Sequence, residues 1–155
     1  NPAALIDIAG LAELKTIAVV DGAIEVGAAV TQAELLSWPE LVDRQPLLAQ
    51  ALPWVGHYQT RQRGTVCGSL AHSDPSSELP LALALLRGEV ILQSRKSRRV
   101  VGAADFQTGM MATALAADEM IVGGADDQHA TARYRRELVR RLGRRALEEV
   151  HDALS

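Results

Sequence analysis

The sequence predicts an α+β fold, because runs that favour strands occur as hairpins, and these are interspersed with helical segments. Two hairpin signals and three helical signals support this class, and we find no internal repeat. The 155 residues are 48% hydrophobic, which is enough to bury the core of one domain or of two small ones. The net charge is −3 and no apolar run approaches the ~18 residues of a membrane span, so we expect no membrane crossing.

The first expected element is a hairpin that joins residues 16–20 to residues 23–28. Both runs are rich in apolar residues, and the pair Asp21-Gly22 lies between them. An Asp-Gly pair flanked by such runs is the strongest short-range signal for a two-residue turn. This pattern therefore predicts an antiparallel pair of strands near the start of the chain.

Two helical segments are expected next. The sequence T-Q-A-E that starts at Thr31 is a capping box, in which the threonine hydroxyl and the Glu34 carboxylate can bind free backbone N–H groups. It predicts a short helix that ends before Pro39. Residues 46–55 are also expected to be helical.

A third helix and a second hairpin follow. Residues 78–87 are apolar and are expected to form a helix that stops at Gly88, since glycine commonly ends helices. Residues 89–93 and 99–101 are expected to pair as strands, with the basic turn 94–98 between them.

Apolar residues recur every four positions in residues 131–154, which predicts a long amphipathic helix. Its other face is rich in arginine, a pattern that can indicate nucleic acid binding. Such runs are more often solvated helix faces, and Glu148 and Glu149 stand four residues after Arg144 and Arg145 as ion-pair partners. No interleaved aromatic residues are present to stack on bases, so we expect no nucleic acid partner.

Residues 64–80, with the sequence G-T-V-C-G-S-L-A-H-S-D-P-S-S-E-L-P, have the composition of a binding segment. Glycine and serine allow backbone N–H groups to approach phosphate and sugar oxygens closely, so we expect an irregular backbone that lies against a polyanionic cofactor rather than a core helix or strand. The alternative is an ordinary surface loop, because clusters of these residues are often simple turns.

The chain has one cysteine, Cys67. One cysteine excludes an internal disulfide framework and a cysteine-ligated metal or iron–sulfur centre within these residues. Any such centre is expected in a partner. The sequence opens without an initiator methionine or a basic leader, which suggests a fragment.

Five short motifs follow one another along residues 24–121. V-G-A-A-V-T occupies residues 26–31, and R-Q-R-G-T-V-C-G-S occupies residues 61–69. The other three motifs are carried by Asp74, Pro75 and Glu78, by Asp105, Phe106 and Gly109, and by Thr113, Leu115, Asp118 and Glu119. In this order and spacing they resemble the FAD-binding subunit or domain of the molybdenum hydroxylases, the family of xanthine dehydrogenase and aerobic carbon monoxide dehydrogenase.

The resemblance implies that the chain consists of parts of two domains. Residues 1–124 would be the FAD-binding domain without its first cofactor loop, and residues 125–155 are similar to the helical tail of the family's separate C-terminal domain. In the family a long stretch lies between these two pieces, and most of the C-terminal domain would be absent here. We therefore expect an interruption of the chain between about Ile121 and Gln128.

The resemblance also implies which residues contact the cofactor. The segment around the FAD pyrophosphate and ribityl chain would consist of Thr65, Val66, Cys67, Gly68 and Ser69. Backbone N–H groups and the two hydroxyls would act there as donors to phosphate. No catalytic residue and no metal ligand is expected in this chain.

Three further residues are implied in the site. Glu78 would accept hydrogen bonds from the cofactor's hydroxyls, and Val55 and Ile121 would pack against the flavin. The alternative for each is plain core packing. Cys67 stands where the family has the first of two glycines, and its Cβ requires a negative φ at that position. A reactive thiol beside the cofactor is the other interpretation of this cysteine.

The function implied by the resemblance is electron transfer through a flavin, in one subunit of a cytoplasmic oxidoreductase complex. FAD would lie in this subunit, and the molybdenum–pterin cofactor and two 2Fe-2S clusters would lie in partners. The partners would be an iron–sulfur small subunit and a molybdenum large subunit, arranged as a dimer of heterotrimers. The alternative is a flavin-free scaffold that only docks those subunits. The substrate would bind in another chain.

Overall fold

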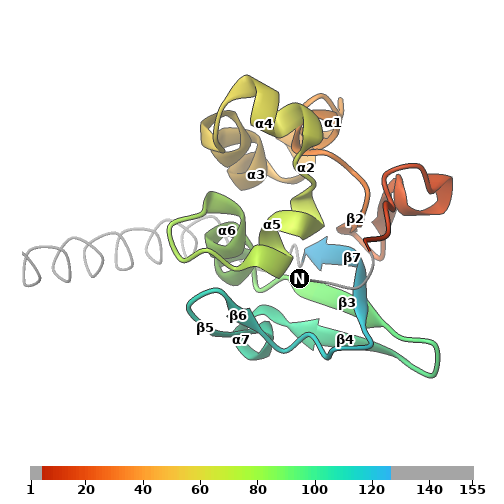
Figure 1. The fold of residues 1–155 in the computed structure, drawn as a ribbon. Coiled ribbons are helices and arrows are strands. Elements are labelled where there is room, and N and C mark those ends of the chain that lie inside the picture. Colours follow the sequence, from red (N-terminus) through yellow and green to blue (C-terminus); the bar gives the residue numbers. More distant parts are fainter. Residues whose placement is uncertain (1–4, 127–155) are drawn as a thin grey trace, which may run out of the picture.

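The computed structural model describes residues 5–126. The amphipathic helix expected over residues 131–154 lies outside the described residues. A five-stranded antiparallel sheet forms one layer of the structure, with the strand order β1-β2-β7-β3-β4. Its strands are β1 (Ile17–Val20), β2 (Ala23–Gly27), β7 (Met120–Asp126), β3 (Glu89–Gln93) and β4 (Arg98–Gly102). Figure 1 shows the last strand, β7, between β2 and β3.

The predicted first hairpin is confirmed. Strands β1 and β2 are paired so that Val20 lies opposite Ala23, which leaves a two-residue turn. Asp21 and Gly22 have φ angles of 51° and 86°. Positive φ at both central residues is the geometry that matches the twist of the two strands, which explains why this dipeptide stands here.

The capping box is also confirmed. It begins α1 (Gln32–Leu36), where the Thr31 hydroxyl accepts a hydrogen bond from the Glu34 N–H at 3.1 Å. In return the Thr31 N–H donates to the Glu34 carboxylate at 2.7 Å. Each group satisfies a donor that the helix leaves free.

The predicted helix over residues 46–55 consists of two helices. They are preceded by a short one after Pro39 and followed by another before residue 64. These elements are α2 (Leu41–Arg44), α3 (Pro46–Ala51), the 3₁₀ helix η2 (Leu52–Trp54) and α4 (Tyr58–Arg63). A second 3₁₀ helix, η1 (Ala12–Leu14), precedes β1.

The expectation of an irregular backbone over residues 64–80 is wrong for most of that segment. Residues Val66–His72 form α5 and Glu78–Leu86 form α6, so only residues 73–77 between them are irregular. The reason is tertiary, because Val66, Cys67 and Leu70 of α5 are buried, and Cys67 and Leu70 pack over Gly124 of β7. The end of α6 also differs from the expectation, since Arg87 adopts the left-handed conformation (φ 53°) one residue before Gly88.

The second predicted hairpin, β3–β4, is confirmed. The Ser94 hydroxyl accepts hydrogen bonds from the N–H groups of Lys96 and Ser97, both at 3.1 Å, and so shapes the turn. After β4 the chain forms α7 (Ala103–Phe106) and a small hairpin of β5 (Gln107–Gly109) and β6 (Ala112–Thr113).

Strand β7 is continuous from Met120 to Asp126, with Met120 opposite Gln93 and Asp126 opposite Ile24. The expected interruption therefore does not fall between Ile121 and Asp126, because an unbroken strand spans these residues. Residues 127 and 128 lie outside the described part of the chain.

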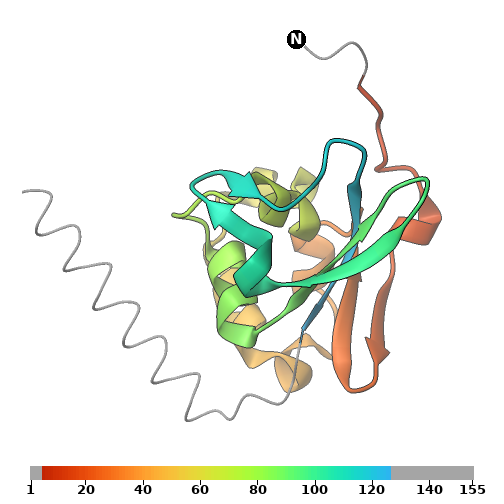
Figure 2. The same ribbon diagram turned by 90° about the horizontal axis from the view of Figure 1, so that it is seen from below.

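The hydrophobic core lies between one face of the sheet and the helices. Helices α5 and α6 lie next to the sheet, and α1 to α4 are stacked beyond them in Figure 1; Figure 2 shows the sheet and helices from below. The largest fully buried apolar side chains are Ile24, Leu35, Leu41, Leu52, Leu79, Leu86, Leu92 and Phe106. No helix within residues 5–126 is long and apolar enough to cross a membrane.

One ion pair ties β4 to the loop before β7. The Arg99 guanidinium donates to both oxygens of Glu119, at 2.7 and 2.8 Å, and the Ala116 N–H donates to the same carboxylate at 2.9 Å. The Glu119 side chain is only 7% exposed. The Arg99 and Ala116 hydrogen bonds hold the pKa of Glu119 at about 2.

Replacement of Glu119 by glutamine is expected to change the acid sensitivity of folding. Because the pKa of Glu119 is lower in the folded chain, its contribution to stability is present above the ordinary carboxyl pKa and is lost as the pH falls toward 2. Urea unfolding between pH 2.5 and 7 should therefore show a shallower loss of stability for Glu119→Gln than for the wild type. The exposed neighbour Asp118→Asn is the control, and parallel curves for Glu119→Gln and the wild type would refute the assignment.

Candidate functional site

Thr65 positions the start of α5. Its hydroxyl accepts a hydrogen bond from the Gly68 N–H at 2.9 Å, which caps the helix. Backbone bonds on either side of Thr65 pair it with Thr31: the Gln32 N–H donates to the Gly64 carbonyl at 2.9 Å, and the Val66 N–H donates to the Val30 carbonyl at 3.1 Å. The cap of α5 is therefore held against the cap of α1.

Gly68 is required by this cap. A Cβ at residue 68 would lie 2.6 Å from the Thr65 hydroxyl oxygen, a distance that real Cβ contacts do not reach. The glycine therefore lets the Thr65 side chain close over the first turn. Its N–H is used within the chain and is not free for a ligand.

Several other backbone donors of residues 65–69 are also engaged. The Val66 N–H binds Val30, and the Ser69 N–H binds the Thr65 carbonyl at 3.2 Å. Within the described residues, the N–H groups of Thr65 and Cys67 have no such partner. The Thr65 hydroxyl accepts one hydrogen bond and keeps its own proton for donation. Of the predicted phosphate donors, these three groups remain, together with the Ser69 hydroxyl, which can donate to a ligand while it accepts a hydrogen bond from Ser77.

The side chains of Val66 and Cys67 face the core. Val66 lines a small apolar cavity of about 40 Å³ together with Leu70 and Leu79. Cys67 is 2% exposed, and its thiol lies 3.6 Å from the Val26 carbonyl oxygen as a hydrogen-bond donor. Neither side chain is therefore available at the surface.

Cys67 does not have a positive φ, so its Cβ meets the condition expected of a residue that stands in place of glycine. Burial raises the pKa of the Cys67 thiol to about 12. A thiol with this pKa stays protonated at neutral pH, whereas reactive cysteines are thiolates. The interpretation of Cys67 as a reactive group is therefore wrong, and the residue packs α5 onto β2.

Ser69 and Glu78 lie on the polar side of α5 and α6. The Ser69 hydroxyl lies 3.1 Å from the hydroxyl of Ser77, the residue that immediately precedes Glu78. Glu78 is half-buried in the first turn of α6 and has no ion pair or hydrogen bond to another described residue. The fold thus places an unpaired carboxylate close to the serine pair.

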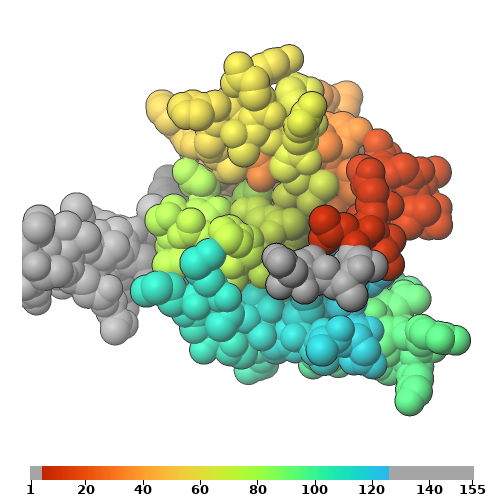
Figure 3. Space-filling model, viewed as in Figure 1, coloured from red at the N-terminus to blue at the C-terminus, as the bar shows by residue number. Residues whose placement is uncertain are grey.

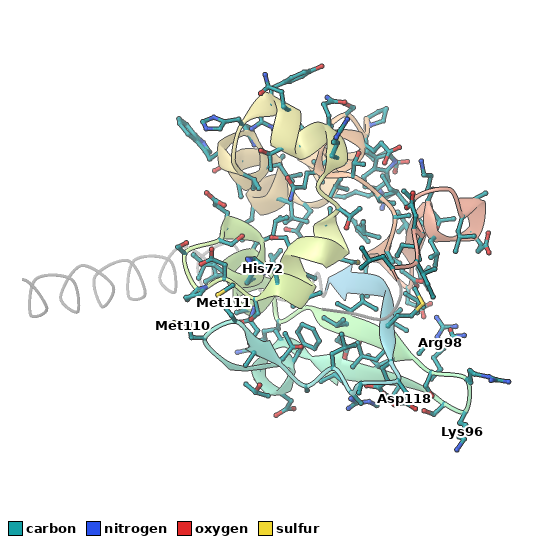
Figure 4. The ribbon with its side chains drawn as sticks, viewed as in Figure 1. His72, Lys96, Arg98, Met110, Met111 and Asp118 are labelled. Atoms are coloured by element: carbon teal, nitrogen blue, oxygen red, sulfur yellow. The ribbon has the colours of Figure 1, made fainter. Side chains whose placement is uncertain are left out.

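The turn between α5 and α6 borders this polar group. Its Asp74 carboxylate accepts hydrogen bonds from the N–H and the hydroxyl of Ser76, at 2.8 and 2.7 Å, which lowers the pKa of Asp74. In the space-filling view α5, in yellow-green, lies between the yellow helices and the teal β5–β6 hairpin (Figure 3). Figure 4 shows His72 next to Met110 and Met111, and the Met111 N–H holds that hairpin to the Ser73 carbonyl at 3.1 Å.

Val55 and Ile121 belong to the hydrophobic core, each with 6% of its surface exposed. Val55 ends η2, and Ile121 lies in β7 opposite Leu92. Core packing is therefore a role that the structure gives to both residues. Their contact with a flavin stays a prediction.

Two polar residues near this segment are not predicted by the sequence patterns. Gln32 is 4% exposed, and its side-chain oxygen has no hydrogen-bond partner among the described residues. Arg61 starts one of the five motifs, and its guanidinium binds the carbonyls of Val55 and Gly56. No periodicity signals either arrangement. No group of three or more metal-ligating side chains is found within residues 5–126.

Comparison with known proteins gives the class of this domain. Residues 1–123 match the family described as the FAD binding domain in molybdopterin dehydrogenase. The medium subunit of nicotine 6-hydroxylase from Paenarthrobacter nicotinovorans is 38% identical over 78% of this chain and 43% of its own length. The carbon monoxide dehydrogenase medium chain from Hydrogenophaga pseudoflava is 33% identical over 79% of this chain and 42% of its own length.

Solved structures agree with this result. Quinoline 2-oxidoreductase from Pseudomonas putida 86 superposes with a TM-score of 0.80 and 35% identity, over 84% of this chain and 46% of that one. Carbon monoxide dehydrogenase from Hydrogenophaga pseudoflava superposes with a TM-score of 0.72 and 31% identity, over 77% of this chain and 42% of that one. The predicted α+β class is confirmed as that of a flavoprotein domain. The chain belongs to the family of FAD-binding domains in molybdopterin dehydrogenases, and it spans less than half the length of these relatives.

The residues present fit part of an FAD molecule. The Thr65 hydroxyl and the N–H groups of Thr65 and Cys67 are donors without a full set of partners among the described residues, which suits phosphate oxygens. The unpaired carboxylate of Glu78 is an acceptor, which suits the hydroxyls of a ribityl chain or a ribose. The polar groups thus match the two kinds of partner that the cofactor requires.

The buried thiol gives a direct test of this local structure. Because the pKa of Cys67 is raised to about 12 by folding, its contribution to stability is complete below the ordinary thiol pKa and is lost as the pH rises toward 12. Between pH 9 and 11 the wild type should lose up to about 1.4 kcal/mol of unfolding free energy per pH unit more than Cys67→Ala. A thiol reagent should modify Cys67 in the native protein only at the rate at which local or global unfolding exposes the thiol. Rapid stoichiometric labelling at pH 8 would contradict the burial of Cys67.

Proposed function

We propose that this chain is the FAD-binding part of a medium-type, electron-transferring subunit in a molybdenum hydroxylase complex. The observation that carries the proposal is the family match over residues 1–123, which includes the whole segment from Thr65 to Glu78. The polar groups of that segment lie on one side of α5 and α6, away from the core.

The partners are proposed from the relatives' names. These relatives are a medium subunit and a medium chain, names that belong to assemblies of several different subunits. We propose an iron–sulfur small subunit and a molybdenum large subunit as partners, in a dimer of heterotrimers. With a single cysteine, these 155 residues do not themselves contain the set of thiolates that a 2Fe-2S cluster requires.

Each candidate residue has a proposed part in holding the cofactor. The hydroxyls of Thr65 and Ser69 and the N–H groups of Thr65 and Cys67 bind the pyrophosphate, and Gly68 lets the threonine approach. The buried side chain of Val66 holds this segment in the core. Glu78 accepts hydrogen bonds from hydroxyls of the sugar chain. Val55 and Ile121 pack against the flavin ring. Bound FAD supplies the chemistry, since a flavin takes up electrons one at a time and releases them as a pair.

A flavin-free scaffold is the second candidate. The observation that favours it is the use of the Val66, Gly68 and Ser69 N–H groups inside the chain, which leaves few free donors in the expected phosphate segment. The burial of Val55 adds to this argument, because a fully packed side chain has little surface left for a ring. The two candidates differ in a measurable way, since only the first requires FAD.

The cofactor content of the native complex tests the proposal. Denaturation should release one FAD per copy of this subunit, identified by chromatography and its visible spectrum. Absence of FAD from a complex with its full set of subunits would refute the electron-transfer proposal and leave the scaffold.

Glu78→Ala should weaken FAD binding by about tenfold to a hundredfold, because hydrogen bonds to charged groups are worth about 1.5–3 kcal/mol. The unfolding temperature of the flavin-free protein should change little, since Glu78 has no partner among the described residues. The matched control is Glu13→Ala, which removes an exposed carboxylate in η1. FAD affinity of Glu78→Ala equal to that of the control would remove Glu78 from the site.

A further inference from the structure

The turn that carries Val55 is held by very little apolar packing. Between Leu52 and Arg61, Val55 is the one buried residue, and the aromatic neighbours Trp54 and Tyr58 are 78% and 66% exposed. A surface turn with one buried anchor is free to rotate about it unless polar contacts hold it. The position of the turn around Val55 therefore depends on its hydrogen bonds as well as on this one buried side chain.

Arg61 provides those hydrogen bonds. One terminal nitrogen of its guanidinium, Nη1, donates to the Val55 carbonyl and to the Gly56 carbonyl, both at 3.0 Å. These carbonyls belong to the C-cap of η2 and to the residue after it, where the chain has left the helix and the carbonyls have no helical partner. A positive charge at that end is also favoured by the direction of the peptide dipoles.

The backbone of the turn is shaped to receive this side chain. Gly56 has a φ of +52°, and a Cβ there would lie 3.3 Å from the Cβ and Cγ2 atoms of Thr60. Glycine thus turns its carbonyl toward α4 without strain. Arg61 can reach both carbonyls because it lies on α4, which starts two residues after Gly56.

Helix α4 also leads directly into the cap of α5. It ends at Arg63, its last turn is closed by the Gly64 N–H on the Thr60 carbonyl at 2.7 Å, and Thr65 follows. The contact of Arg61 with Val55 therefore links the turn before α4 to the same helix that ends at Thr65. We call the two hydrogen bonds from Arg61 to the Val55 and Gly56 carbonyls the Arg61 clamp. Helix α4 and this clamp together hold Val55 and Thr65, the two ends of the candidate site, at a fixed separation.

We infer that Arg61 is a positioning residue for the flavin end of the cofactor: by binding the Val55 and Gly56 carbonyls it fixes Val55 relative to the phosphate-binding residues around Thr65. This inference rests on the proposed function, since it takes Val55 as a contact of the flavin ring. Arg61 acts through Val55 and does not itself touch the cofactor.

Binding of two probes to the flavin-stripped native complex tests this role. ADP contains the pyrophosphate and lacks the flavin ring, whereas FAD contains both. Arg61→Gln should weaken FAD binding about tenfold, the loss expected for charge-assisted hydrogen bonds, and should leave ADP binding within about twofold. The visible circular dichroism of residual bound flavin should also change, because the ring loses a fixed neighbour.

Arg63→Gln is the matched control, because Arg63 lies on the same helix, is exposed and has no hydrogen bond or ion pair to another described residue. It should bind FAD like the wild type. Arg61→Lys keeps a donor and a charge without the guanidinium, so it should recover part of the lost FAD affinity.

Three results would overturn the inference. FAD affinity of Arg61→Gln within about twofold of the wild type would show that the clamp does not position the ring. Equal losses of FAD and ADP affinity, with an unchanged flavin spectrum, would show that Arg61 only stabilises the fold. A wild-type complex without FAD would refute the proposed function and this inference together, and that result is visible before any variant is made.

Discussion

The candidate site depends on one backbone contact, the short antiparallel bridge between Thr31 and Thr65. Its two hydrogen bonds join residues 30–32 to residues 64–66, which are far apart in the sequence. Both threonines are helix caps, so the bridge places the starts of α1 and α5 side by side. From Thr65, α5 runs across β2 and β7, and its Ser69 hydroxyl lies against the Ser77 hydroxyl in the turn before α6. Two family motifs therefore meet because a single bridge connects them.

The small residues of the segment after Gly64 serve packing as much as binding. Gly68 gives room to the capping hydroxyl of Thr65, and Cys67 fills the space between α5 and β2. The buried face of α5 consists of Val66, Cys67 and Leu70, and Gly124 of β7 leaves room for the last two, so a segment with a composition typical of loops forms a packed helix here. The donors that remain are the Thr65 and Ser69 hydroxyls and two backbone N–H groups, so any cofactor held here meets a small and specific set of atoms.

The residues of the candidate site fall into a buried group and a group at the surface. The buried group consists of Val66, Cys67 and Ile121, which belong to the hydrophobic core. Substitutions of these residues would mainly lower the stability of the fold. Ser69 and Glu78 lie at the polar edge and can change with less effect on the fold. Arg61 stands between these groups, because it fixes a core residue, Val55, through bonds made near the surface. Variants of these three kinds therefore separate folding from cofactor binding in experiments.

The sequence by itself determined the elements that depend on contacts within a few residues. The Asp21-Gly22 turn and the Thr31–Glu34 capping box are satisfied by neighbouring atoms, so local signals were sufficient. The class of domain was likewise determined by the sequence, because the order and spacing of the five motifs are properties of the chain itself. The tertiary structure alone decided that residues 66–72 are helical, that β7 lies between β2 and β3, and that Arg61 binds the Val55 turn. The place of β7 and the reach of Arg61 leave no periodic pattern in a sequence. Helix α5 has a local cap at Thr65 and buried residues at helical spacing, but its seven residues are too few for that pattern to outweigh a composition typical of loops.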